Sequence, residues 1–427
     1  MRAWWLGVAV SIAAGLIVGA GATGQFAELS PDLVREPALQ YFTKPTTDSV
    51  ARLNAALRSG AVRLTFDETT GYLPSLLDAL HLPAESQMLI FSKTSVQSRW
   101  ITPRTPRALY FNDSVTIGYI AGAEYIEFAA EDPQQGVIFY TLDQRPAEQP
   151  LIERRDFCLS CHNANATLDV PGMLVRSVVA TASGNTVPRF GNYVADHRSP
   201  FGERWAGHYV TGRHGAMTHL GNATLVSRAD PDTLTIAETL NVESVKERFE
   251  AGRYVSPHSD IVALLVFEHQ MRMTNLLTRI GWDTRLALET GRSDAAAIMR
   301  RAANEVVDYM LMVDEALLPD RVSGTSGFAG KFAAQGPADR QGRSLRQLDL
   351  STRLLRYPCS YMIYADAFDA LPSEARDAIY RRLWQVLSGE EAGARYARLS
   401  GADRRAMVEI LRDTKKNLPA YFEPIDR

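Results

Sequence analysis

Short runs of β-branched and aromatic residues alternate with turn residues in the first third of the chain. Dipeptides such as Asn-Asp, Ala-Gly and Asp-Pro separate neighbouring runs, a pattern typical of strands joined by turns. The close spacing of the runs predicts an antiparallel sheet. The expected strands are Met88–Phe91, Ala108–Phe111, Val115–Ile120, Tyr125–Phe128 and Val137–Tyr140.

Apolar residues recur at helical spacing before this region and again from Asp260 to the end of the chain. The early helices are expected at Ser49–Leu57 and at Pro74–His81, the second with a proline in its first turn. The later helices are expected at Asp260–Ile280, Asp294–Leu317, Leu348–Leu355, Ser373–Leu387 and Gly401–Lys416.

The stretch between these regions has a less regular pattern. We expect a brief helix at Gln149–Cys158 and a strand at Leu174–Ala182. Gly191–Asn222, dense in glycine, histidine and aromatic residues, is expected to be an ordered loop, and Thr233–Asn241 is expected to be a strand or a helix. Glycine and polar residues at Ser323–Ser344 predict a long connection.

These patterns together predict an α+β protein with a β-rich N-terminal region, a Gly/His-rich middle segment and a mainly α-helical C-terminal region. We place the regions at 25–150, 151–230 and 231–427, with 1–24 set apart. A chain of 427 residues can bury a large core and is expected to form two or three packed units. The net charge of −3 gives no reason to expect a nucleic-acid partner.

Residues 1–24 have the order of features that directs export. Met1-Arg2 precedes an apolar run that ends in the small residues Ala20-Gly21-Ala22, as in a secretory signal peptide. The run is also about long enough to span a bilayer, which takes about 20 apolar residues, so an uncleaved N-terminal membrane anchor is the alternative. No later stretch has this length, since Ile261–Phe267 is far too short.

The pentapeptide Cys158-Leu159-Ser160-Cys161-His162 carries the most specific chemistry of the chain. Cys-x-x-Cys-His is the attachment motif of a c-type haem. Two cysteines three positions apart can form thioethers with the vinyl groups on one edge of a porphyrin. The histidine that follows then lies under the ring, where a neutral imidazole is a good iron ligand.

Three other interpretations of the two cysteines remain open. Half of a structural zinc site would need a second ligand pair, and the only other cysteine, Cys359, lies far downstream without a nearby histidine. A thioredoxin-like redox pair is expected at a strand-to-helix turn, which the flanking sequence does not resemble. A disulfide between Cys158 and Cys161 is the third. Three cysteines are an odd count for a disulfide-stapled exported protein, whereas two thioethers would leave only Cys359, in an apolar and aromatic setting typical of a buried inert thiol.

At residues 158–162, and in its export signal, the chain resembles the c-type cytochromes. The resemblance implies one covalent haem c held through Cys158 and Cys161, with His162 as the proximal iron ligand, in the segment 151–230. Because haem c is attached outside the cytoplasm, it also implies a periplasmic protein. The motif occurs once, which disfavours multihaem proteins and dihaem peroxidases. The common small cytochromes c place this motif near the start of a compact helical domain, whereas here a β-rich region precedes it.

The second axial position of a haem iron takes another ligand or stays open. Five of the eight histidines fall between His162 and His219. His214 and His219 are candidate imidazole ligands and Met217 is a candidate thioether ligand; sulfur ligation would raise the reduction potential and a second imidazole would lower it. Each of them taken singly is more often a hydrogen-bonded loop or core residue. Met173, close to the motif, is a competing candidate with a core methionine as its simpler interpretation.

Two groups outside the middle segment also carry candidate chemistry. His269, in the apolar helix from Asp260, is a further distal candidate, although a hydrogen-bonded interhelical histidine is the simpler interpretation. Gly324–Lys331 superficially resembles a phosphate loop but lacks the required spacing, so we do not expect nucleotide binding there.

The sequence leaves a choice between functions. The first hypothesis is an exported monohaem c-type cytochrome that transfers electrons to a redox partner protein. The alternative is a haem-c oxidoreductase acting on a small oxidant such as peroxide or a nitrogen oxide, with a general base from the His-rich stretch 197–219 and with Arg204 or Arg213 stabilising charge. A sensor ranks third, because no segment resembles an output domain.

Overall fold

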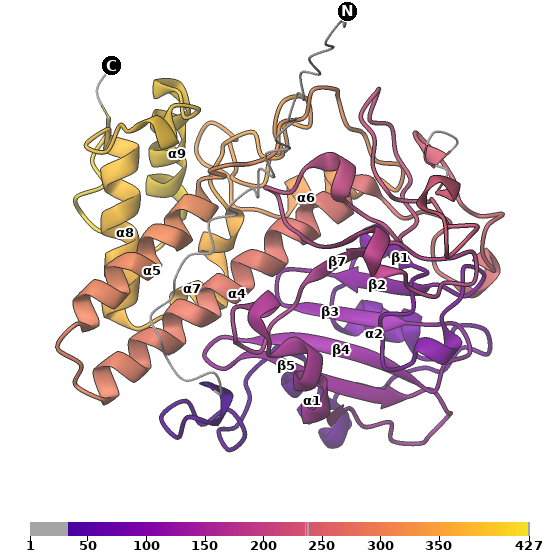
Figure 1. Ribbon diagram of the computed structural model, residues 1–427. Coiled ribbons are helices and arrows are strands. Elements are labelled where there is room, and N and C mark those ends of the chain that lie inside the picture. The colour runs from indigo at the N-terminus through magenta and orange to yellow at the C-terminus, as the bar shows by residue number, and fades with distance from the viewer. Residues whose placement is uncertain (1–32, 235, 237–238, 426–427) are drawn as a thin grey trace, which may run out of the picture.

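A six-stranded antiparallel sheet, in which every strand pairs with its neighbour in the chain, occupies one side of the computed structural model, beside the C-terminal helices (Figure 1). The structure describes residues 33–425 apart from 235, 237 and 238, so the predicted signal peptide or anchor at 1–24 lies outside the described residues. The strands are β1 (Met88–Ile90), β2 (Arg107–Phe111), β3 (Val115–Tyr119), β4 (Tyr125–Asp132), β5 (Gly136–Asp143) and β6 (Glu153–Arg154).

The five strands expected from the sequence are confirmed, and β4 and β5 are longer than predicted, at eight residues each. The tight turn between β4 and β5 explains why the two strands pair over their whole length. The carboxylate of Asp132 accepts hydrogen bonds from the backbone amides of Gln134 and Gln135, each 3.0 Å long. Gly136 follows with φ = 83°, a conformation that favours glycine, so the chain reverses tightly and β5 returns along the whole of β4.

One face of the sheet packs against two helices, α1 (Ser49–Ser59) and α2 (Leu73–Ala79). Alternate strand residues such as Tyr110 and Phe128 share a hydrophobic core with both helices. The carboxylate of Asp48 begins α1 by accepting from the amides of the first turn. The same carboxylate accepts a 2.6 Å hydrogen bond from the hydroxyl of Tyr140, which ties the start of α1 to β5.

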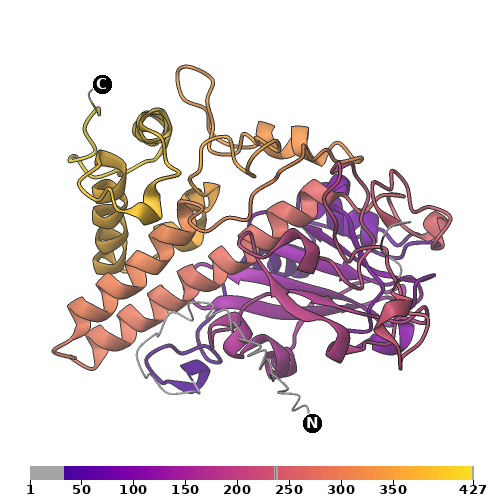
Figure 2. The ribbon, with the colours of Figure 1, turned by 45° about the horizontal axis from the view of Figure 1, so that its top comes forward.

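The long helix α4 (Ile261–Glu289) crosses the opposite face of the sheet (Figure 2). The ring of Phe267 lies 4.9 Å from that of Phe111 on β2. The other side of α4 packs against α5 (Ala295–Met310) and against α8 (Ser373–Ser388), with α9 (Gly401–Thr414) beyond. Because it has a sheet on one side and helices on the other, α4 is buried along nearly its whole length. The β-rich region and the C-terminal helices therefore share one core.

Two of the predicted helices are wrong, and each is replaced by a specific hydrogen-bonded alternative. In place of a helix over Gln149–Cys158, β6 pairs with β5, and only the short 3₁₀ turn Asp156–Cys158 follows. In place of a helix over Leu348–Leu355, the side chain of Asp349 accepts from the amides of the next residues and closes a turn. Aspartate side chains of this kind compete with helix formation.

The remaining elements are short. β7 (Val175–Val178) confirms the expected strand at Leu174–Ala182 and pairs with β8 (Asn192–Ala195), within a stretch that was expected to be loop. The helices α3 (Leu159–His162), α6 (Phe328–Ala334) and α7 (Asp366–Asp369) are one or two turns each, and α6 lies inside the predicted long connection. The fold class is α+β, as predicted. None of the helices in the described part of the chain is long and apolar enough to cross a membrane.

Candidate functional site

The Cys-x-x-Cys-His motif lies on a single helical turn directly after β6. The 3₁₀ turn Asp156–Cys158 leads into α3, so Cys158 and Cys161 are separated by about one turn and His162 ends the helix. Both cysteines are free thiols; Cys158 is half-buried and Cys161 is exposed. Neither cysteine is in a disulfide, and His162 directly follows the second one in the chain.

The imidazole of His162 is oriented by a hydrogen bond to the backbone. Its Nδ1 donates to the carbonyl oxygen of Gly172 at 2.9 Å, and the amide of Gly172 donates back to the carbonyl of His162 at 2.9 Å. Because Nδ1 holds the proton, Nε2 retains the lone pair that can bind a metal. Burial lowers the pKa of His162 below its usual value, which favours the neutral ligand form.

Helix α4 fixes the backbone that holds this histidine. The side chain of Asn275 accepts from the amide of Met173 at 3.1 Å and donates to its carbonyl at 2.7 Å. A Cβ atom on Gly172 would lie 2.2 Å from Asn275 Oδ1, so only glycine fits between the loop and the helix. The acceptor of His162 Nδ1 is therefore positioned by a residue more than one hundred positions downstream.

The motif packs on the face of the sheet that carries Arg107, Glu127 and Phe139. Register places these side chains on one face, because Leu109 is opposite Gly118 and Gly118 is opposite Glu127. The ring of Phe139 lies 4.7 Å from the ring of His162. Glu127 is 3.6 Å from Arg107 and accepts a 2.6 Å hydrogen bond from Ser95. An aromatic ring and an ion pair thus lie beneath the motif.

The thiols do not have the properties of a redox pair. Burial, with a smaller contribution from the charge of Glu127, raises the pKa of Cys158 to about 11. A catalytic redox cysteine needs the opposite shift, since the thiolate is the nucleophile. Cys359 is fully buried and its pKa is raised to about 12, as expected for an inert core thiol. The described residues contain no group of three or more His, Cys, Asp and Glu side chains arranged to hold a metal ion.

These differences predict an order of alkylation in the haem-free protein. At pH 8 iodoacetamide should label the exposed Cys161 first, Cys158 more slowly and Cys359 only after denaturation. Labelling of Cys158 should accelerate as the pH rises from about 8 to about 10, because its thiolate becomes more populated toward its raised pKa. Peptide mapping by mass spectrometry measures all three sites. Blocked Cys158 and Cys161 that react only after reduction would show a disulfide instead.

The predicted distal candidates form a cluster of their own. The rings of His214 and His219 are 4.6 Å apart, and His219 contacts Trp205. Met217 is buried in the core shared with α4. Among the described residues, no hydrogen bond or ring contact joins His214, His219 or Met217 to His162. The structure thus does not bring these three residues into contact with the motif.

The other predicted residues belong to structural networks. His269 hydrogen-bonds to Ser360 at 2.7 Å and to His197 at 2.8 Å, all fully buried. Arg204 forms a buried ion pair with Glu268, at 2.9 Å. Arg213 is exposed and pairs with Glu243. These contacts do not support the hypothesis that the stretch 197–219 supplies a general base or that Arg204 or Arg213 stabilises charge during catalysis.

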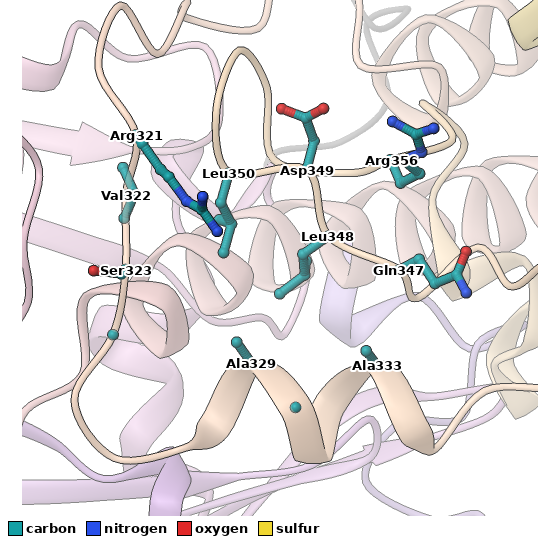
Figure 3. Close-up of a pocket in the computed structure, with 12 residues that line it drawn as sticks. Arg321, Val322, Ser323, Ala329, Ala333, Gln347, Leu348, Asp349, Leu350 and Arg356 are labelled. Atoms are coloured by element: carbon teal, nitrogen blue, oxygen red, sulfur yellow. The ribbon is translucent and has the colours of Figure 1, made fainter.

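A cavity of about 620 Å³ lies away from the motif, between α6 and the turn that contains Leu348 (Figure 3). Ala329 and Ala333 line it from α6, while Leu348 and Leu350 face them. The stretch Gly324–Lys331, which superficially resembles a phosphate loop, comprises the loop before α6 and the first turn of this helix. Its amides at residues 325 and 326 donate to the carboxylate of Asp260, which leaves them bonded within the protein.

Comparison with known proteins adds no relative. No protein family model, no curated protein and no solved structure matches the chain. The functional argument therefore depends on the motif and its surroundings.

Proposed function

We propose that this protein is an exported, periplasmic c-type cytochrome with one haem, and that it transfers electrons to a redox partner protein. The single observation that supports this most is the arrangement of His162. Its Nδ1 is held by the carbonyl of Gly172, and its Nε2 is left for a metal, directly after two free cysteines at haem-attachment spacing.

The residues around the motif fit a haem. Two unpaired thiols can each form a thioether, and Phe139 offers an aromatic surface beside the proximal imidazole. The bound haem would supply a one-electron iron centre. The protein would hold it covalently through Cys158 and Cys161 and would keep His162 in one orientation and one tautomer. A rigid proximal ligand favours electron transfer because little reorganisation accompanies the change of iron charge.

The exposure of the motif suits exchange of electrons with a partner. Cys161 is exposed, and the side chain of Phe157 is 51% exposed beside it. An apolar residue at a thioether edge is the kind of surface on which small redox partners dock transiently. Arg154 and Arg155 already pair with Asp156 and Glu153 respectively, so they contribute little net charge to this surface.

The proposal predicts covalent haem at one per chain. Expressed with export and a haem-c maturation system, the wild-type protein should give a c-type pyridine haemochrome spectrum that survives denaturation and acid–acetone extraction. Cys158→Ala/Cys161→Ala should lose covalent haem, because no thioether can form. Cys359→Ala is the matched control, since it removes a buried cysteine away from the motif and should keep the haem. Absence of covalent haem in the wild type under these conditions would refute the proposal.

A further inference from the structure

The cavity between α6 and the turn that contains Leu348 has the size of a small-molecule site (Figure 3). Its volume of about 620 Å³ lies within the range of about 300–1,000 Å³ that is usual for such sites. No residue of the Cys-x-x-Cys-His motif lines it. Any ligand of this cavity would therefore bind separately from the proposed haem.

The helix α6 presents only small residues to the cavity, because its large residues point the other way. Phe328 and Phe332, four positions apart, belong to the hydrophobic core and are buried. Ala329 and Ala333 line the cavity from the neighbouring face of the helix. A Cβ atom on Gly330, between them, would meet no other atom within 4 Å. The side chains of α6 therefore leave the space beside the helix unfilled.

The wall opposite α6 is apolar, and backbone hydrogen bonds hold it in place. Leu348 and Leu350 face the helix across the cavity and are only partly buried (Figure 3). The amide of Val322 donates to the carbonyl of Leu350 at 2.8 Å, and the amide of Arg356 donates to the carbonyl of Gln347 at 2.8 Å. An apolar group can therefore enter between two preformed walls without ordering the chain, which lowers the cost of binding.

The charges around the cavity favour an anion. Arg321 and Arg356 line it on opposite sides, and the guanidinium of Arg321 points into the space above α6 (Figure 3). Neither guanidinium forms a hydrogen bond or an ion pair with the described residues. The one carboxylate among the lining residues, that of Asp349, points away from α6 and accepts from the amides of Ser351 and Thr352. Arginine donors without a partner suit a carboxylate or a phosphate group.

We propose that this cavity binds a small organic anion, with its carboxylate or phosphate group on Arg321 and its apolar body between α6 and the two leucines. Arg356 adds positive charge from the opposite side. A ligand with only a charged group, or only an apolar body, would use half of the site and bind more weakly. The inference goes beyond the proposed function, because neither a haem nor a redox partner takes part in it.

Isothermal titration calorimetry of the purified protein tests the proposal with probes that separate the two contributions. Octanoate, which has a charged group and an apolar body, should bind saturably at one per chain. Acetate, which lacks the apolar body, and 1-octanol, which lacks the charge, should each bind at least about tenfold more weakly. Octyl phosphate in place of octanoate distinguishes the two headgroups, because the tighter of the two probes carries the group that the site prefers.

Three variants, each checked for folding by far-UV circular dichroism, locate the binding. Arg321→Gln should weaken octanoate binding about tenfold and leave 1-octanol binding unchanged, because only the charged contact is lost. Ala333→Trp should abolish octanoate binding by filling the cavity. The matched control Arg63→Gln removes an exposed arginine that does not line the cavity and should bind like the wild type.

Two results would overturn the proposal. The first is a folded wild type that binds neither octanoate nor octyl phosphate saturably. The second is a folded Arg321→Gln or Ala333→Trp variant that binds octanoate as tightly as the wild type does. Because Arg321 is exposed, its replacement is expected to leave the fold intact, so the proposal stays testable if Ala333→Trp does not fold. None of these results depends on whether the protein carries a haem.

Discussion

Arg204→Met is expected to lower the free energy of unfolding by about 4 kcal/mol, because it leaves the carboxylate of Glu268 buried without its cation. Both side chains are almost inaccessible, at 3% and 0% exposure. Arg204 also donates to the backbone carbonyl of Ser199 at 2.7 Å, so the variant leaves this oxygen without its hydrogen bond as well. Urea denaturation followed by circular dichroism measures the loss.

The size of this loss should depend on pH. Burial raises the pKa of Glu268 to about 7 even though Arg204 lowers it, and removing the arginine raises the pKa further. The folded state then holds a proton that the unfolded state, with a glutamate pKa of about 4.3, has released. Stability contributed by protonated Glu268 is therefore lost as the pH rises through the folded pKa. We expect a larger destabilisation at pH 8 than at pH 5.

Two controls define the cause. Arg204→Met/Glu268→Leu should recover part of the stability, because no charge is left buried, although the backbone carbonyl of Ser199 stays without the hydrogen bond from Arg204. Arg213→Met removes an arginine whose ion pair is exposed and should change stability by less than about 1 kcal/mol. A loss in Arg204→Met that is independent of pH and not relieved by the double substitution would contradict the role of Glu268.

Asp260→Ala is expected to cost about 3–5 kcal/mol, since one buried carboxylate serves two elements. It accepts from the amides of Val262 and Ala263 at the start of α4, and from the amides of Thr325 and Ser326 before α6. Removal leaves four amides without their acceptor. The midpoint of urea denaturation measures the effect.

Ser400→Ala is the matched control for a cap that serves one helix. Ser400 is exposed and accepts only at the start of α9, so its loss should cost about 1 kcal/mol. Asp260→Asn keeps one acceptor oxygen and should lie between the two. A cost for Asp260→Ala no larger than that for Ser400→Ala would show that the bonds to the loop before α6 contribute nothing.

Helices and strands in which apolar residues recur with a regular spacing from end to end could be predicted from the sequence. The strand Val115–Tyr119 and the helix Ser373–Ser388 match their expected positions closely. The C-terminal end of α4 was not predictable in this way. The prediction ended the helix at Ile280, because a polar stretch follows that residue. In the structure, Arg279 and Asp283 form a buried ion pair at 2.9 Å, which lets the helix continue to Glu289. Asp283 neutralises the charge of Arg279 four residues away, whereas the hydropathy pattern alone predicts that both side chains are exposed.

The candidate site could be predicted only where its functional residues are neighbours in the sequence. Cys158, Cys161 and His162 follow from one motif, and they remain the proposed attachment residues. The supporting Asn275 lies 102 positions from Met173, to which it bonds, and no local pattern links the two. His214 and His219 were candidates because they follow the motif in the sequence, but the structure packs their rings against each other, 4.6 Å apart.

The order of the elements along the chain sets when each side of the sheet is closed. The residues of α1 and α2 precede the motif, whereas Ile261–Glu289 follow it by about one hundred positions. In a polypeptide that leaves the cytoplasm N-terminus first, Cys158–His162 would emerge while the second face of the sheet is still bare. A haem attached to the chain at that stage would meet a sheet face that α4 does not yet cover. When α4 then packs on the sheet, the side chain of Asn275 hydrogen-bonds to the backbone of Met173 and fixes the loop that orients His162.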